Sequence, residues 1–169
     1  MINVNYQKRK NQELFKSLEN PNTTFLSSAQ NYIPIYKRFF ALNETNYNNI
    51  NLNHFLYLTS VIERAKEDEY SNTYSCRISK LTGIGNIKKN VFFKMAPLLD
   101  PFKYLVGKYD VTDKRIMTLP SLNSTTDDCH SKIIDPNNSA YVDGLFIFLL
   151  DNLLENHNFI HGLKYYGSF

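Results

Sequence analysis

Lys94 is the residue of this chain whose type and position most clearly suggest a functional role. It closes the apolar run Val91-Phe92-Phe93, and Pro97 follows it closely, which predicts a buried strand that ends in a cation. An ammonium group that is buried without a partner is strongly destabilised, so Lys94 should meet an anion, either a carboxylate or a phosphate. The alternative is that Lys94 points outward from an edge strand and its aliphatic stem covers apolar surface.

Two glycines lie just before this strand, in Thr82-Gly83-Ile84-Gly85-Asn86. Glycines at this spacing let backbone amides approach an anion closely, as phosphate-binding loops do. Because no third glycine follows, Gly83 and Gly85 also fit an ordinary tight turn. The glycine pattern therefore leaves both interpretations open.

Asp143 is an acid at the head of an otherwise apolar row on a predicted helix. Spacing alone explains it as an acid in the first turn, where a negative charge interacts favourably with the helix dipole. No Ser/His/Asp or Cys/His arrangement suited to nucleophilic catalysis can be singled out. His157 and His161, with Cys129-His130, are a weak zinc candidate, but Asn158 and Gly162 predict that the helix ends between the two histidines, and we expect no metal site.

The elements that must position these residues follow from the hydrophobic pattern. Residues 55–63 and 73–81 predict an antiparallel hairpin around a polar turn at 65–72, with Cys76 and Ile78, and Leu81 as a further candidate, near its inner face. Residues 5–18 predict a weak amphipathic helix, and residues 32–42 a short element broken by Pro34.

The second half of the chain predicts one clear helix after a long loop. Residues 102–106 could form a helical turn, residues 121–138 should be loop, and Asn138-Ser139 offers a helix cap. Apolar residues at helical spacing predict the buried stripe of this helix: Val142, Leu145, Phe146, Leu149 and Leu153. The polar residues of the opposite face predict the side that contacts water: Asp151, Asn152 and Glu155. The aromatic run 159–169 predicts a strand entering a sheet; since its edge would be unprotected, we expect a truncated chain or a covering partner.

Length and composition indicate one globular domain of 169 residues. The net charge of +3 gives no strong electrostatic footprint for nucleic acid or anionic lipid. The basic N-terminus has no apolar core of a secretory signal, and no apolar run approaches the roughly 20 residues of a membrane span, so we expect no membrane partner. Cys76 and Cys129 are then expected to be free thiols in an intracellular, reducing compartment.

The order of these elements resembles the N-terminal lobe of protein kinases: hairpin, glycine loop, strand with lysine, helix with acid, returning strand. Four segments of the chain are similar, more specifically, to a protein-kinase-like family of giant DNA viruses: VFFKMAPLLDPFKYLVGKYD, LPSL, NNSAYVDGLF and FIHGLKYYGSF. The resemblance covers about 55–169, with an insertion at about 102–138, and leaves 1–54 as a polar N-terminal extension. It implies an α+β fold in which a small antiparallel sheet packs on a helix.

By this resemblance Lys94 would bind the nucleotide phosphates, Asp143 would be the helix acid paired with it, and Gly83 and Gly85 would lie near the phosphates. The cofactor implied is ATP with Mg²⁺, in a Ser/Thr-type kinase acting on a protein substrate in the host cytoplasm or in the virion. The chain has Asp where kinases have Glu, and it lacks His-Arg-Asp-like and Asp-Phe-Gly motifs. We therefore expect an inactive lobe that needs a C-terminal lobe as partner; the alternative is a non-catalytic interaction or virus-specific structural module.

Overall fold

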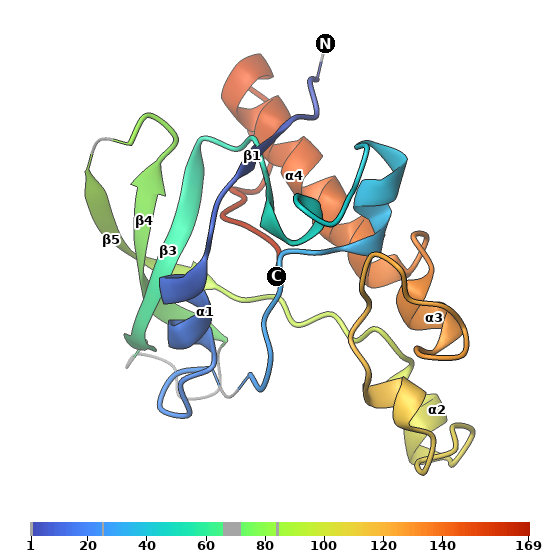
Figure 1. Cartoon of the computed structure of the whole chain (residues 1–169). Coiled ribbons are helices and arrows are strands. Elements are labelled where there is room, and N and C mark those ends of the chain that lie inside the picture. The colour runs from blue at the N-terminus through green and yellow to red at the C-terminus, as the bar shows by residue number, and fades with distance from the viewer. Residues whose placement is uncertain (1, 25, 66–71, 84) are drawn as a thin grey trace.

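The computed structural model describes residues 2–24, 26–65, 72–83 and 85–169, and shows a mixed α+β fold with two small antiparallel sheets (Figure 1). One sheet pairs β1 (Tyr6–Lys8) with β2 (Ile50–Leu52), and the other has the order β3 (Leu56–Arg64), β4 (Thr73–Lys80), β5 (Asn86–Phe92). The α-helices are α1 (Gln12–Leu18), α2 (Pro101–Leu105), α3 (Ser131–Ile134) and α4 (Ser139–His157). The described residues also contain three short 3-10 helices: η1 (Pro34–Arg38), η2 (Tyr47–Asn49) and η3 (Lys114–Met117).

The predicted hairpin is present as β3 and β4, in antiparallel register from Leu56 opposite Lys80 to Arg64 opposite Tyr74. Cys76 and Ile78 are buried, as the alternating pattern predicted. Helix α1 packs on this sheet and contributes Leu14 and Leu18 to the same core. The predicted turn at 65–72 lies largely outside the described residues.

Strand β5 differs from the predicted buried strand in two ways. It ends at Phe92, so Lys94 lies two residues beyond it, and Val91 is its one buried residue. The physical reason is its place in the sheet: β5 pairs with β4 on one side, forms the outer strand of the sheet, and carries Lys88 and Lys89 where the prediction considered only the apolar end.

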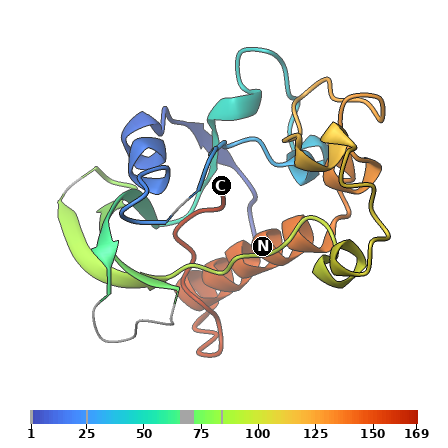
Figure 2. The ribbon, with the colours of Figure 1, turned by 90° about the horizontal axis from the view of Figure 1, so that it is seen from below.

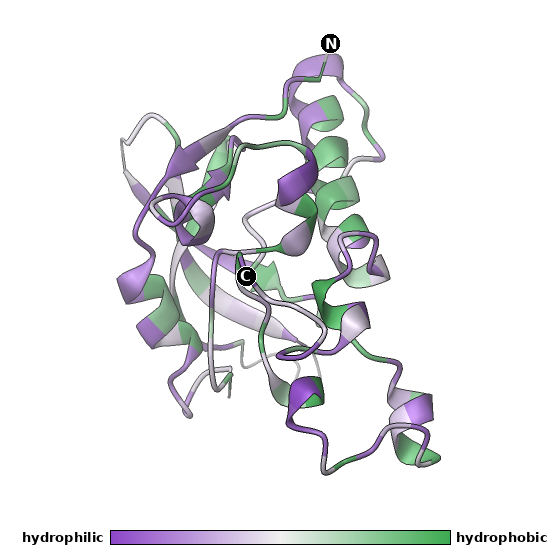
Figure 3. Cartoon of the chain, turned by 45° about the vertical axis from the view of Figure 1, so that its right-hand side comes forward, coloured by the Kyte–Doolittle hydropathy of each residue, from purple (hydrophilic) through white to green (hydrophobic). Residues whose placement is uncertain are grey.

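Helix α4 begins where predicted, because the Asn138 side chain accepts a hydrogen bond from the Ala140 backbone N–H at 3.0 Å. It ends at Asn158, whose left-handed backbone (φ 54°) terminates the helix. Green covers much of the helix in Figure 3, so its apolar residues do not form one narrow stripe.

The buried face of α4 matches the predicted stripe only in part, since Leu145 and Leu149 pack against the core. Tyr141, Phe148 and Asp151 are buried, whereas Val142 and Phe146 of the predicted stripe are 45% and 57% exposed. The prediction that Asp151 faces water was wrong. Asp151 lies against the C-terminal segment, where it accepts a hydrogen bond from the Tyr165 backbone; its burial raises the pKa of the carboxyl group.

The C-terminal segment 159–169 is irregular, so the predicted strand was wrong. It turns back from α4 and runs between that helix and the β3-β4-β5 sheet, which brings the C-terminus to the centre of the molecule (Figures 1 and 2). A backbone hydrogen bond joins this segment to the sheet, from the Leu58 N–H to the Tyr166 carbonyl at 2.9 Å. The Tyr165 ring packs against Phe148 and His54, and this side-chain packing replaces the expected strand pairing.

The N-terminal residues 2–54 share both hydrophobic cores with the rest of the chain. Leu14 and Leu18 join the sheet core, and Ile35, Tyr36 and Ile50 join a second core together with α4 and Tyr165. Residues 101–138 form an outlying part with α2, η3 and α3 (Figure 1), so the predicted helical turn at 102–106 is present and the predicted loop 121–138 contains one short helix. Among the helices of the described residues, none has the length and apolar character needed to cross a membrane.

Candidate functional site

Lys94 and Asp143 form an ion pair in which the ammonium group contacts both carboxylate oxygens. The Lys94 ammonium nitrogen lies 2.8 Å from Oδ1 of Asp143 and 2.7 Å from Oδ2. The two side chains are 55% and 38% exposed, so water and solutes reach both charges. The structure thus brings together the lysine and the acid that the sequence analysis singled out.

Two anchors fix the chain segment that carries Lys94. On one side the Phe93 N–H donates to the Asn72 carbonyl at 2.7 Å, which continues the pairing of β5 with β4. On the other side the Asn138 amide donates to the Leu98 carbonyl at 2.8 Å. The residue that caps α4 therefore also holds the Lys94 segment beside the helix that presents Asp143.

Asp143 is the fifth residue of α4, and the first turn holds no acid. The interaction of a charge with the helix dipole falls off within the first turn, so the dipole explanation loses most of its force. Contact with Lys94 is the interaction that the geometry offers this carboxylate.

Gly83 and Gly85 are not brought to the Lys94–Asp143 pair. Gly83 follows β4 and Gly85 precedes β5, at the end of the sheet opposite Lys94 (Figure 1). The seven residues of β5 lie between, which at about 3.3 Å per residue is about 23 Å. A single phosphate group cannot touch both places.

The backbone of these glycines matches the turn interpretation. Their φ angles are +75° and +84°, in the left-handed region, and the Gly83 N–H closes a turn to the Lys80 carbonyl at 2.9 Å. A Cβ atom added to either glycine would meet no atom within 4 Å. The need for glycine therefore comes from the backbone angle, since no close approach of another group is involved.

An open polar cleft of about 500 Å³ lies at the start of α4. Its walls are the segment 97–101 on one side and Lys132, Asp135 and 137–139 on the other. The acids Asp100 and Asp135 line it together with Lys132, so its charge is mixed and favours no single kind of ligand.

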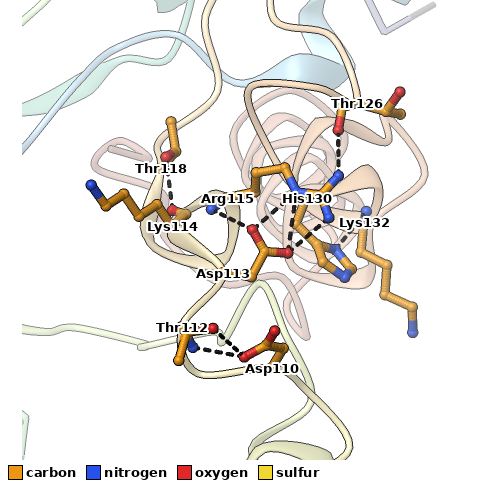
Figure 4. Close-up of polar contacts among 9 residues, drawn as sticks. All are labelled: Asp110, Thr112, Asp113, Lys114, Arg115, Thr118, Thr126, His130 and Lys132. Atoms are coloured by element: carbon orange, nitrogen blue, oxygen red, sulfur yellow. Dashed lines mark hydrogen bonds and ion pairs between the residues drawn. The ribbon is translucent and has the colours of Figure 1, made fainter.

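Polar contacts within the insertion hold η3 and α3 in place (Figure 4). Arg115 makes a fork with both oxygens of Asp113, with bonds of 2.9 Å from Nε and from Nη2, and its Nη1 donates to the Thr126 carbonyl at 3.0 Å. Hydrogen bonds from Arg115 lower the pKa of the Asp113 carboxyl group. His130 Nδ1 accepts from the Lys132 N–H, which caps α3. These side chains are therefore occupied by contacts that stabilise the insertion itself.

The zinc candidate of the sequence has no counterpart in the described part of the chain. In these residues no three His, Cys, Asp or Glu side chains gather closely enough to hold a metal ion. Cys129 is buried and its thiol donates to the Thr118 carbonyl at 3.1 Å.

Two residues that the sequence analysis passed over have an unusual environment. Arg9 and His54 carry buried side-chain nitrogens that have no hydrogen-bond partner. Arg9 lies in a polar, basic stretch that predicts exposure, and nothing in the local pattern around His54 distinguishes it, so no sequence signal marked them.

Comparison with known proteins adds no relative to this geometry: no protein-family model, no curated protein and no solved structure matches the chain.

Proposed function

We propose that this chain is the nucleotide-binding lobe of a divergent protein-kinase-like phosphotransferase. In this proposal Lys94 binds phosphate oxygens of ATP, and Asp143 holds the lysine in position. The observation that carries the proposal is the contact of one ammonium group with both oxygens of one carboxylate, between the end of a sheet and a long helix.

The chemistry of the pair suits this role. A carboxylate within hydrogen-bond distance keeps the lysine charged and directs its ammonium group, while two of the three ammonium protons at most are used by Asp143. Because Lys94 is half-exposed, a phosphate can approach the remaining donor without unfolding anything. Asp143, one methylene shorter than Glu, still reaches the lysine because Lys94 lies beyond the strand end, close to the helix.

The proposal assigns no catalytic step to this chain alone. The glycine turn lies too far from Lys94 to cover the same phosphate, so phosphate binding would depend on Lys94 and on groups of a second, C-terminal lobe. Mg²⁺ ligands and a catalytic base would belong to that lobe as well.

A titration of the protein together with its C-terminal lobe, with a fluorescent ATP analogue in the presence of Mg²⁺, tests the proposal. We expect Lys94→Ala to weaken binding at least about tenfold, as loss of a charge-assisted contact to phosphate does. Lys88→Ala is the matched control: Lys88 is an exposed lysine on β5, with a looser ion pair to Glu63 at 3.8 Å. Equal affinity of wild type, Lys94→Ala and Lys88→Ala, or no binding by the wild type, refutes the proposal.

A second candidate function, a non-catalytic interaction module, is favoured by exposed apolar side chains in the insertion. Phe102 and Leu105 of α2 are 79% and 78% exposed, and Val106, Val111 and Met117 are also open to solvent. Such a surface suits contact with a protein. If this function is correct, we expect the chain to self-associate in analytical ultracentrifugation. The double variant Phe102→Ser with Leu105→Ser should abolish this association, whereas Lys94→Ala should leave it unchanged.

A further inference from the structure

A small, partly open cavity lies where β1, β2 and the C-terminal segment meet. Arg9, Tyr36, His54, Tyr57, Tyr165 and Ser168 supply the polar and aromatic part of its wall. About 10 Å³ is left for the centre of a water-sized occupant, which is room for about one. Neither Lys94 nor Asp143 lines the cavity, although Ser168 of its wall lies beside Gly144, the residue that follows Asp143 in α4.

The cavity wall contains polar atoms without partners. Both ring nitrogens of His54 are buried without a hydrogen bond of good geometry, although the Leu52 and Tyr166 backbones lie near enough to affect its pKa, and the residue is 3% exposed. The Nε and Nη1 nitrogens of Arg9 are likewise buried and unpartnered, while its guanidinium carbon lies 3.7 Å from the centroid of the Tyr57 ring. Arg9 takes part in none of the ion pairs found among the described residues. Its positive charge is therefore not balanced by a carboxylate.

Among the hydroxyl groups of the wall, that of Tyr57 interacts with the Arg9 side chain, whereas the other three bond to one another. Tyr36 bonds to the Tyr165 hydroxyl, which donates to Ser168 Oγ at 2.8 Å. The three hydroxyl groups thus form a chain among themselves.

The count of donors and acceptors decides what the cavity can hold. Arg9 offers one N–H from Nε and two from Nη1, and a neutral His54 offers one N–H and one bare nitrogen. A water molecule accepts at most two hydrogen bonds, fewer than the three N–H groups of Arg9 alone, and it leaves the guanidinium charge unbalanced. An anion accepts several hydrogen bonds and donates none, and it also balances the guanidinium charge.

We propose that this cavity binds one monatomic anion, of the size of chloride, held by Arg9 and His54. A carboxylate or phosphate group is too large for the space. The anion would link β1, β2 and the buried end of the chain, so its binding would stabilise the fold.

Thermal unfolding in sodium chloride against sodium gluconate at equal ionic strength tests this proposal, because gluconate is too large to enter. A ligand bound by the folded state alone raises Tm by about 3–6 °C for each tenfold increase above its Kd in a chain of this size. We expect that rise with chloride and bromide in the wild type and in Arg38→Gln, whose guanidinium is exposed and bonds to Asn137. Arg9→Gln should lose the dependence on halide.

A crystal of the wild type soaked in sodium bromide provides a measurement that does not depend on any variant. We expect an anomalous scattering peak between Arg9 and His54. Equal Tm of the wild type in chloride and gluconate, or a bromide-soaked crystal without that peak, overturns the proposal; the nucleotide titration with Lys94→Ala is unaffected by either result.

Discussion

Replacement of His54 by Gln should remove a large part of the acid sensitivity of this protein. Burial of the imidazole, and next the charge of Arg9, lower the pKa of His54 to about 4, against about 6.5 in an unfolded chain. Between these values the unfolded chain binds a proton that the folded protein does not. Stability is therefore complete above about pH 6.5 and is lost as the pH falls towards about 4.

The magnitude follows from the separation of the two pKa values. A difference of about 2.5 units, at about 1.4 kcal/mol each, gives a loss of about 3 kcal/mol over the whole interval and about 2 kcal/mol between pH 7 and pH 5. His54 is 3% exposed, so solvent screening reduces this little. In a protein of ordinary stability, such a loss is a large fraction of the total.

Urea unfolding at pH 7 and pH 5 in chloride-free gluconate buffer measures the effect. Asp151, whose pKa burial raises, titrates in wild type and His54→Gln alike, so its contribution cancels in the difference between them. We expect the wild type to lose about 2 kcal/mol more than His54→Gln. An equal loss in both proteins would mean that folded His54 takes up a proton freely, and the reasoning would be wrong.

The same experiment in chloride buffer has a different expected outcome. An anion beside His54 favours the protonated imidazole and so raises its pKa towards the unfolded value. The extra acid sensitivity of the wild type should then shrink.

Three further substitutions test the packing and the ion pair by equilibrium urea unfolding. In a double-mutant cycle, Lys94→Ala and Asp143→Ala should show a coupling below about 1 kcal/mol, because both charges are substantially exposed; a coupling of several kcal/mol would contradict this. Phe148→Ala should cost about 3–5 kcal/mol, since this ring of α4 is fully buried and packs against Tyr165, and a loss below 1 kcal/mol would show that the site collapses. Gly162→Ala should cost about 1–3 kcal/mol, because the new Cβ would lie 2.6 Å from the Leu150 carbonyl oxygen; unchanged stability would show that the turn shifts at no cost.

Local sequence patterns were sufficient for the β3–β4 hairpin and for the start of α4. Alternation placed Cys76 and Ile78 inside, and Asn138 marked the helix cap, because these features depend on neighbours in sequence. The contact of Lys94 with Asp143 joins two such local features across the insertion. Spacing could nominate each residue, and only the family resemblance suggested that they meet.

The orientation of α4 could not be obtained in the same way. The helix is apolar on more than one side, so periodicity does not choose which side is buried. The C-terminal segment makes the choice: Tyr165 packs on Phe148 and its backbone bonds to Asp151, which turns an acid inward and leaves Phe146 exposed. The information lies in a contact between distant parts of the chain.

The structural role of the asparagines could not be predicted from the sequence either. The chain has 21 of them, which composition alone left without a structural explanation. Asn11 donates at 2.7 Å to the side-chain oxygens of both Asn31 and Asn51, and so joins the segment before α1 to β2 and to the chain before η1. An amide that pairs with another amide leaves no periodic pattern, because either partner can stand at any distance in sequence.

Lys94 and Arg9 are two cations whose energetics differ, and this makes the two proposals independently testable. The Lys94 ion pair is half-exposed, so its loss changes folding little and any effect of Lys94→Ala on nucleotide affinity reports on binding itself. Arg9 has buried nitrogens without partners, which cost stability as long as the cavity is empty. An occupant would therefore reveal itself as folding stability, whereas a ligand at Lys94 would reveal itself as affinity at nearly constant stability.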